Sequence, residues 1–182
     1  MHESCCQTKA PPSNAILLHW RNFSQDDGQQ FSTPDTDWVQ IYMDLVDKLR
    51  HDEFHQHVDQ GGQQAQRRRP LVILTQPSSV QTSGVQTLAN LTNATIETGV
   101  DVPDAMCLLQ RHQSTVLLSY ASTFSQGPVL FGSSAVSKNV HYPLVKLQKP
   151  AVTVRVPFWH YHLVGKMGVE RFEVPVEEMI LS

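Results

Sequence analysis

An amphipathic segment at residues 38–49 limits the possible folds more than any other part of this sequence. Its apolar side chains recur at the three- and four-residue spacing of one buried helical face: Trp38, Ile41, Tyr42, Leu45, Val46 and Leu49. Side-chain oxygens of the kind that cap a first helical turn precede it, on Asp35, Thr36 and Asp37. We therefore predict a helix here that packs its inner face on the core.

Short apolar segments predict strands along the rest of the chain. Four of them lie before residue 140, at residues 15–23, 71–75, 115–121 and 128–131. The last third predicts strands throughout, at residues 141–147, 151–158, 159–164 and 169–176, with a tight turn marked by Gly165 and Gly168.

Two further segments concern helices. Residues 85–96 fit either a helix or a strand, because leucines at helical spacing compete with many β-branched residues. Asp101 and Pro103 form a start signal for a short helix that runs to about residue 113. Because helices come mainly early and strands late, we predict an α+β fold. It is a small β-rich domain, an open sheet or an OB-like barrel, with two or three helices.

Length and composition indicate one domain. The chain has 182 residues, of which 40% are apolar and 17% charged, so it has enough apolar side chains for a core. Residues 1–14 contain Pro11-Pro12 and few apolar side chains, and we predict a flexible leader. The domain then covers residues 15–182, with a low-complexity, Gln- and His-rich loop at residues 51–69.

Charge and cysteine content indicate a protein that stays inside the cell. The formal net charge of −3 argues against a histone-like grip on nucleic acid. The three cysteines, Cys5, Cys6 and Cys107, have no framework spacing and are expected to be reduced thiols. No apolar run approaches the roughly 20 residues that span a bilayer, so we expect no membrane partner. The arginine run at 67–69 is of the kind that contributes to nuclear import.

Catalytic and cofactor motifs fail on spacing. The loop at residues 76–84 follows a strand as a phosphate-binding loop would, but it has one glycine and no lysine. Cys107 and His112 are five residues apart, which does not align a dyad on a helix. His51 and His55 have a spacing that can chelate a metal, but they begin a Gln-rich segment of a kind that is usually solvated. The pair His160/His162 lacks a third nearby metal ligand. We expect no enzyme activity, no catalytic residues, no cofactor, no metal and no small-molecule substrate.

The carboxyl-terminal part combines aromatic and basic side chains on predicted strands. Its candidate residues for binding nucleic acid or a partner are Arg155, Phe158, Trp159, Tyr161, Lys166 and Arg171. Rings that stack on bases, with cations that follow phosphates, are what a single-stranded nucleic-acid platform needs. Two other interpretations stay open: these rings belong to the core, or they form a protein interface, which also favours Trp, Tyr and Arg.

Two resemblances bear on function. The Gln/His-rich interruption at residues 51–66 and the Trp159/Tyr161 strand with Arg155 and Lys166 resemble subunits of the fly telomere-capping (terminin) complex. That resemblance implies action at chromosome ends through protein contacts and single-stranded DNA binding. The segments at residues 22–24 and 116–120 are similar to small proteasome-assembly chaperones.

Together these features predict a non-enzymatic subunit of a nuclear multiprotein complex, with a cytoplasmic pool as a further expectation. It would help to protect chromosome ends through other protein subunits and single-stranded DNA. The alternative is an assembly chaperone or scaffold that acts by heterodimerisation.

Overall fold

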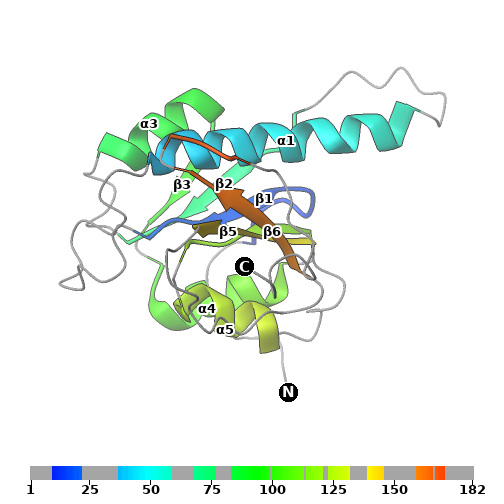
Figure 1. Cartoon of the computed structure of the whole chain (residues 1–182). Coiled ribbons are helices and arrows are strands. Elements are labelled where there is room, and N and C mark those ends of the chain that lie inside the picture. The colour runs from blue at the N-terminus through cyan, green and yellow to red at the C-terminus, as the bar shows by residue number, and fades with distance from the viewer. Residues whose placement is uncertain are drawn as a thin grey trace, which may run out of the picture.

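The computed structural model describes residues 10–21, 37–58, 68–76, 83–98, 100–112, 114–120, 123–131, 139–145, 159–165 and 167–170. These residues form an open sheet with helices on both of its faces (Figure 1). The strands are β1 (Ile16–His19), β2 (Leu71–Leu74), β3 (Thr95–Glu97), β4 (Thr115–Leu117), β5 (Asn139–Val145) and β6 (Trp159–Val164). All pairings between these strands are parallel.

The strand order shows how the chain winds. Across the sheet the order is β3-β2-β1-β4-β5-β6, so the first three strands extend one way from β1 and the last three extend the other way. The helices α1 (Trp38–Val58) and α3 (Ser83–Thr92) pack together on one face. The helices α4 (Val102–Arg111) and α5 (Thr123–Phe131) pack together on the other face. This is the doubly wound arrangement, with the order of dinucleotide-binding sheets.

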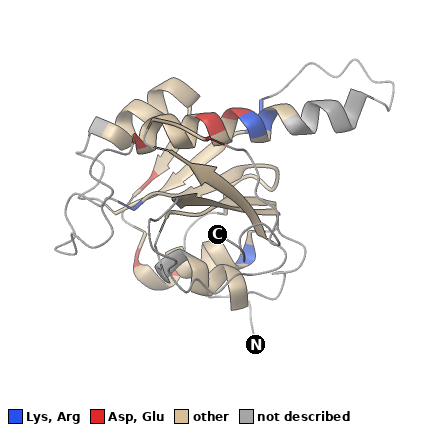
Figure 2. Cartoon of the chain, in the orientation of Figure 1, with Lys and Arg blue, Asp and Glu red and all other residues tan. Residues whose placement is uncertain are grey.

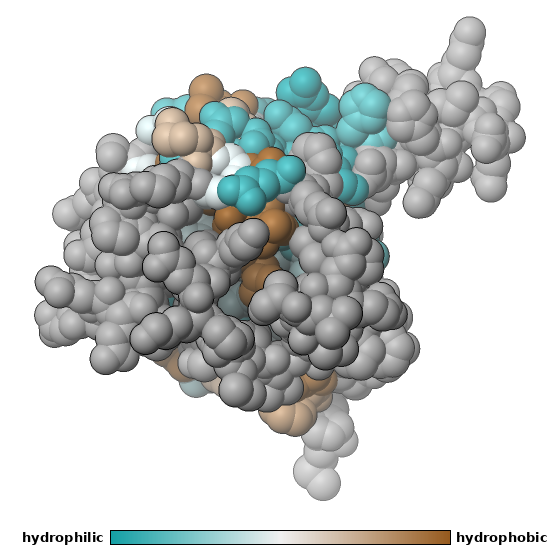
Figure 3. Space-filling model, in the orientation of Figure 1, coloured by the Kyte–Doolittle hydropathy of each residue, from teal (hydrophilic) through white to brown (hydrophobic). Residues whose placement is uncertain are grey.

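Burial on both faces explains the composition of the strands. In β1, Ile16 and Leu18 belong to the core under α1 and α3, whereas Leu17 belongs to the core on the side of α4 and α5. Parallel strands covered on both faces are nearly continuous apolar runs rather than alternating ones. Accordingly, the described strands contain a single charged residue of the Lys, Arg, Asp and Glu types, Glu97. Figure 2 shows charged residues mainly on α1. Figure 3 shows hydrophilic residues along α1 and hydrophobic ones beneath it.

The structure corrects the predicted fold class. Helices and strands are both present and the sheet is open, as expected, but the OB-like barrel is wrong because the sheet is parallel and does not close. The α+β organisation is also wrong, because α1, α3, α4 and α5 each connect two parallel strands. Such crossovers are the βαβ units that the order of predicted elements had argued against.

Several individual elements agree with the sequence. The helix from residue 38, the strand at residues 71–75, and the helix that begins at Asp101 are confirmed, and β6 has the predicted bounds. The turn at Gly165 and Gly168 is confirmed by a hydrogen bond from the Gly165 N–H to the Gly168 carbonyl, 2.8 Å long. The segment 85–96 contains both alternatives, since α3 ends at Thr92 and β3 follows.

Other elements differ. The predicted strand at residues 128–131 is the end of α5, which accommodates Pro128. The predicted loop at residues 51–69 begins as helix, because α1 continues to Val58. The predicted strand at residues 151–158 and most of the one at 169–176 lie outside the described residues.

The structure also bears on the predicted reduced thiols and on the predicted flexible leader. Cys107, expected as a reduced thiol, is disulfide-bonded, and its partner lies outside the described residues. Of the predicted flexible leader, residues 10–14 are described, and Pro11 and Pro12 line a small pocket with Val72, Leu74 and Leu108. None of the described helices has the length and apolarity that crossing a membrane requires.

Candidate functional site

The candidate site lies at the carboxyl ends of β1 and β4, where the winding direction of the sheet reverses. Sheets of this kind bind ligands in the crevice at that position. Trp20 and Arg21 follow β1, and Ser119 and Tyr120 follow β4. The two strand ends are joined directly, because the Arg21 backbone N–H donates to the Ser119 Oγ over 2.9 Å. The Ser119 side chain therefore links the carboxyl ends of the two strands.

Aromatic side chains fill this position. Their ring contacts pass from the α1 side of the sheet to the α4/α5 side in the order Trp20, Tyr42, Trp38, Tyr120 and Tyr142, and Tyr142 then contacts both Trp159 and Tyr161. We call this set the aromatic chain. The centroids of rings in contact lie 5.3 to 6.5 Å apart, within the range of favourable aromatic pairs.

The Tyr42 side chain, on α1, links the aromatic chain to the backbone that follows β4. Its hydroxyl donates to the Leu118 carbonyl over 3.4 Å and accepts from the Tyr120 N–H over 3.3 Å. Tyr42 is 1% exposed, and burial raises the pKa of its phenol. The hydroxyl therefore stays protonated and keeps its donor role at neutral pH.

Trp38 and Tyr120 are the most exposed members of the aromatic chain. Both are half-buried, and their rings are stacked with centroids 5.3 Å apart and planes 21° apart. Burial raises the pKa of Tyr120 as well, so its phenol is neutral near pH 7. The partial exposure of this stacked pair makes it the accessible aromatic surface of the crevice.

The sequence around the crevice lacks phosphate-binding chemistry. In dinucleotide-binding sheets the β1–α1 connection supplies several glycines, which let the backbone approach a pyrophosphate. Here residues 20–37 contain a single glycine, Gly28, and no lysine. The fold therefore offers the usual place for a nucleotide but not the residues that hold one.

The structure places two of the six predicted binding residues. Trp159 and Tyr161 lie on β6 with 8% and 3% of their surface exposed, and both contact Tyr142. Their rings face the core under α4 and α5 rather than solvent. The other four, Arg155, Phe158, Lys166 and Arg171, lie outside the described residues.

Titratable side chains also gather away from the crevice, on β5 and β6. The Nδ1 of His141 and the Nε2 of His162 lie 2.8 Å apart, within hydrogen-bond distance. Across the described ranges, no three His, Cys, Asp or Glu side chains are arranged to hold a metal ion.

His19, at the end of β1, is buried, and burial, followed by the nearby Arg21 charge, lowers its pKa to about 4.

The fold and crevice define a doubly wound α/β domain. Beyond that class, no family model, no curated protein and no solved structure matches the chain.

Sequence reasoning missed most of the crevice residues, namely Trp20, Arg21, Tyr120 and Tyr142. One signal in the sequence points to them. Trp20 and Tyr120 lie in the second halves of the predicted strands 15–23 and 115–121, and the carboxyl ends of parallel strands meet at one edge of a sheet. The signal is usable only once the strands are known to be parallel.

Proposed function

We propose that the protein is a non-enzymatic subunit of a multiprotein complex and that it binds a protein partner at the carboxyl edge of its sheet. The observation that carries this proposal is the aromatic chain at the winding reversal. The position that holds the ligand in nucleotide-binding sheets of this topology is filled by the protein's own side chains.

Filling of the crevice speaks against a small-molecule substrate. A ligand site is normally a preformed cavity with a few polar groups directed into it. Here Tyr42 uses its hydroxyl on the Leu118 carbonyl, and Ser119 uses its Oγ on the Arg21 backbone. The polar groups at the reversal thus stabilise the strand ends.

The exposed part of the crevice has the composition of a protein-binding hot spot. Trp, Tyr and Arg are the residue types that contribute most binding energy at protein interfaces. Trp38, Tyr120 and Arg21 supply one of each, and all are half-buried. The stacking of Trp38 on Tyr120 restricts both rings before a partner arrives, which lowers the entropy lost on binding.

A comparison of tagged variants tests the proposal. Tyr120→Ala removes the outer ring, and Arg21→Glu reverses the charge while keeping the backbone hydrogen bond to Ser119. Leu91→Ala is the control, because Leu91 is 61% exposed at the end of α3 that leads into the amino end of β3. Each protein is purified from the native tissue, checked by thermal melting, and its co-purifying proteins are quantified.

We expect both edge variants to recover a specific partner roughly tenfold less than wild type, and the control to recover it fully. Equal recovery by all three folded proteins would contradict a partner site at this edge.

Nuclear location, protection of chromosome ends and contact with single-stranded DNA are proposals that rest on the sequence. Because Trp159 is a core residue, its substitution would test stability rather than DNA contact. The cleaner variant replaces the three cations Arg155, Lys166 and Arg171 by alanine. Retardation of single-stranded oligonucleotides at low salt, lost in this variant, supports DNA contact. Absence of retardation, alone and with the captured partner, refutes it.

Heterodimerisation, as in an assembly chaperone, is a second candidate. Its supporting observation is that β6 is an edge strand, bonded to β5 along its length. Among the described residues only Val169 forms a bridge on its other side. Edge strands are templates for strand addition from another chain. Native mass spectrometry of the captured complex distinguishes this candidate, which requires a one-to-one pair.

A further inference from the structure

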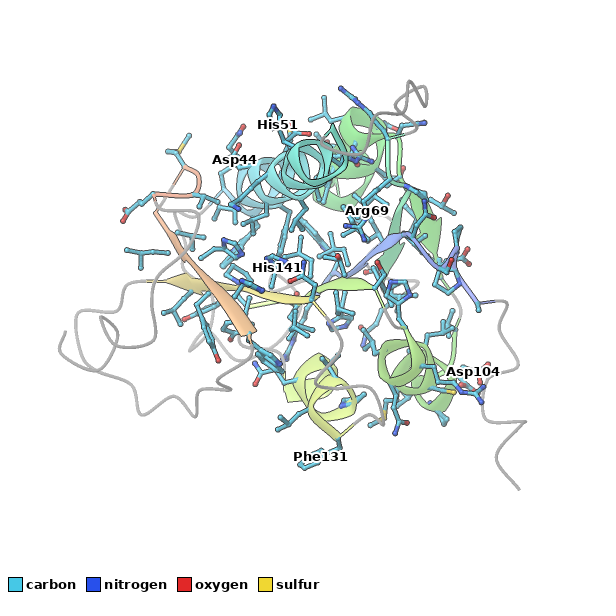
Figure 4. The ribbon with its side chains drawn as sticks, turned by 90° about the vertical axis from the view of Figure 1, so that its right-hand side faces the viewer. Asp44, His51, Arg69, Asp104, Phe131 and His141 are labelled. Atoms are coloured by element: carbon cyan, nitrogen blue, oxygen red, sulfur yellow. The ribbon has the colours of Figure 1, made fainter. Side chains whose placement is uncertain are left out.

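Three histidines lie on the face of β5 and β6 that is turned toward α1. His141 of β5 is in register with His160 of β6, and their stacked rings have centroids 4.8 Å apart. His162 lies two residues further along β6, with its ring centroid 5.1 Å from that of His141. His141 and His162 are 3% and 0% exposed, whereas His160 is exposed. Figure 4 shows His141 between the sheet and α1.

The hydrogen bond between the two buried rings depends on their protonation. The Nδ1 of His141 and the Nε2 of His162 are 2.8 Å apart, so one nitrogen donates and the other must accept through a bare lone pair. A first proton can bind on the far nitrogen of the donor ring and leave this bond intact. A second proton occupies the accepting nitrogen and places two N–H groups opposite each other. The doubly protonated pair cannot keep this geometry.

The surroundings of His141 also disfavour the first proton. Its Nε2 is buried and has no hydrogen-bond partner within the described chain. The groups whose charge acts on His141 are His162 and His160 of β6, Lys48 of α1, and Arg69 ahead of β2. None of them is a carboxylate. Burial first, and then these groups, hold the pKa of His141 well below its usual value.

The pair lies where the sheet is least supported. Within the described chain β6 is bonded to β5 alone, apart from the turn that follows it. That turn is held to α1 by a hydrogen bond of 3.3 Å from the Val169 N–H to the Asp44 Oδ2. The hydrogen bond between His141 and His162 therefore adds a side-chain link between the edge strand and its neighbour.

We propose that the His141–His162 pair is a pH-sensitive latch, which holds β6 and the turn after it in place near neutral pH and releases them on acidification. Release uncovers the edge of β5 and withdraws from the core the rings of Trp159 and Tyr161, which β6 carries and which pack under α4 and α5 in the neutral form. The inference goes beyond the proposed partner site at the carboxyl edge and does not depend on it.

Hydrogen–deuterium exchange of the full chain at about pH 7.4 and about pH 5, corrected for intrinsic exchange rates, tests the latch. Peptides that cover β6 and the turn should lose roughly tenfold in protection at the lower pH. Peptides of β1 and β2 exchange through global unfolding, which the buried His19 also makes easier at low pH, and they should stay better protected than β6 at about pH 5. Equal protection of all strands at about pH 5 would mean global acid unfolding, and unchanged protection of β6 would mean no latch. Either result overturns the proposal.

Matched variants assign the effect to the pair. His141→Asn with His162→Gln places amide groups near the bonded Nδ1 and Nε2 positions and cannot titrate in this range. It should abolish the selective loss of β6 protection at about pH 5. His51→Gln, at an exposed position of α1, is the control and should retain the loss. A double variant that still opens selectively at low pH overturns the assignment.

A second variant keeps the test decisive if the double variant does not fold. Lys48→Gln removes a like charge that acts on His141, so the closed form accepts a proton more readily. The penalty of acidification falls, and the β6 opening should move to lower pH. An opening that stays at the same pH, or moves up, contradicts the role assigned to charge at this site.

Discussion

Arg69 joins the amino ends of the three central strands. Directly ahead of β2, its guanidinium donates from Nε to the carbonyl of Asn14, before β1, over 2.8 Å. A second guanidinium nitrogen donates to the hydroxyls of Ser114 and Thr115, at the start of β4, over 2.6 and 3.0 Å. Arg69 is 7% exposed, which removes it from the basic run at 67–69 that suggested nuclear import. Figure 4 shows its position.

Arg69→Met should therefore lower the free energy of unfolding by about 2–4 kcal/mol, because it leaves buried acceptors of charge-assisted hydrogen bonds unpaired. Arg68→Met, one residue earlier and exposed, should change it by less than about 0.5 kcal/mol. Urea denaturation monitored by tryptophan fluorescence measures both. Equal effects of the two substitutions would show that Arg69 does not link the strands.

His19 makes the stability of the chain pH-dependent. Its pKa is about 4 in the folded protein and about 6.5 in the unfolded chain, so only the unfolded chain takes up its proton between these values. The contribution is complete above the unfolded pKa and is lost as the pH falls. Wild type should lose about 2 kcal/mol through His19 between about pH 7.5 and about pH 5, since one pKa unit corresponds to about 1.4 kcal/mol.

Urea denaturation of His19→Gln at both pH values measures this contribution. The variant should show a pH dependence that is smaller than that of wild type by this amount. An identical pH dependence would mean that His19 is not buried in its neutral form.

Among the elements, α4 begins with a cap that the sequence identifies. The Asp101 Oδ1 accepts from the Asp104 N–H over 2.8 Å, and Pro103 occupies the first turn. Asp101→Ala should lower the unfolding free energy by about 1 kcal/mol, whereas Asp101→Ser keeps a capping oxygen and should lower it by less than half of that amount. Thermal denaturation compares the two. A loss in the serine variant as large as in the alanine variant would contradict the cap.

The elements also show which predictions sequence reasoning can make. The helix α1 was predictable because its buried positions repeat with the helical period over several turns. The strands β3 and β4 have three residues each, too few to show a period. The apolar run at residues 128–131 resembles a buried strand, but it ends a helix that packs against α4. Short apolar runs do not distinguish these states without their tertiary neighbours.

The candidate site was less predictable than the elements. The rings of Trp159 and Tyr161 on a predicted strand, with cations nearby, suggested a binding platform. In the structure the two rings pack into the core under α4 and α5 and are buried. On the opposite face of β6 His162 is buried, whereas His160 is exposed. The aromatic chain joins residues as distant in sequence as Trp20 and Tyr161, and only the strand order brings them together.

At the scale of the whole molecule, the topology indicates one function and the side chains at the crevice indicate another. The strand order is that of a nucleotide-binding sheet, while the crevice carries aromatic residues in contact with one another and no glycine-rich loop. Fold alone does not determine function, and the residues at the site decide between the possibilities. Our proposal is that a domain with the architecture of a ligand-binding protein is used here for protein contact.

Isothermal titration calorimetry of the purified chain with ATP, NAD and NADP tests this account most directly. Because the aromatic side chains fill the crevice, we expect no measurable binding heat at ligand concentrations up to about 1 mM. A site with a binding free energy more favourable than about −4 kcal/mol would be detected at these concentrations. Binding of any of these nucleotides with a dissociation constant of about 10 μM or lower, weakened by Arg21→Glu, would contradict it. The crevice between β1 and β4 would then be an open ligand site rather than a closed one.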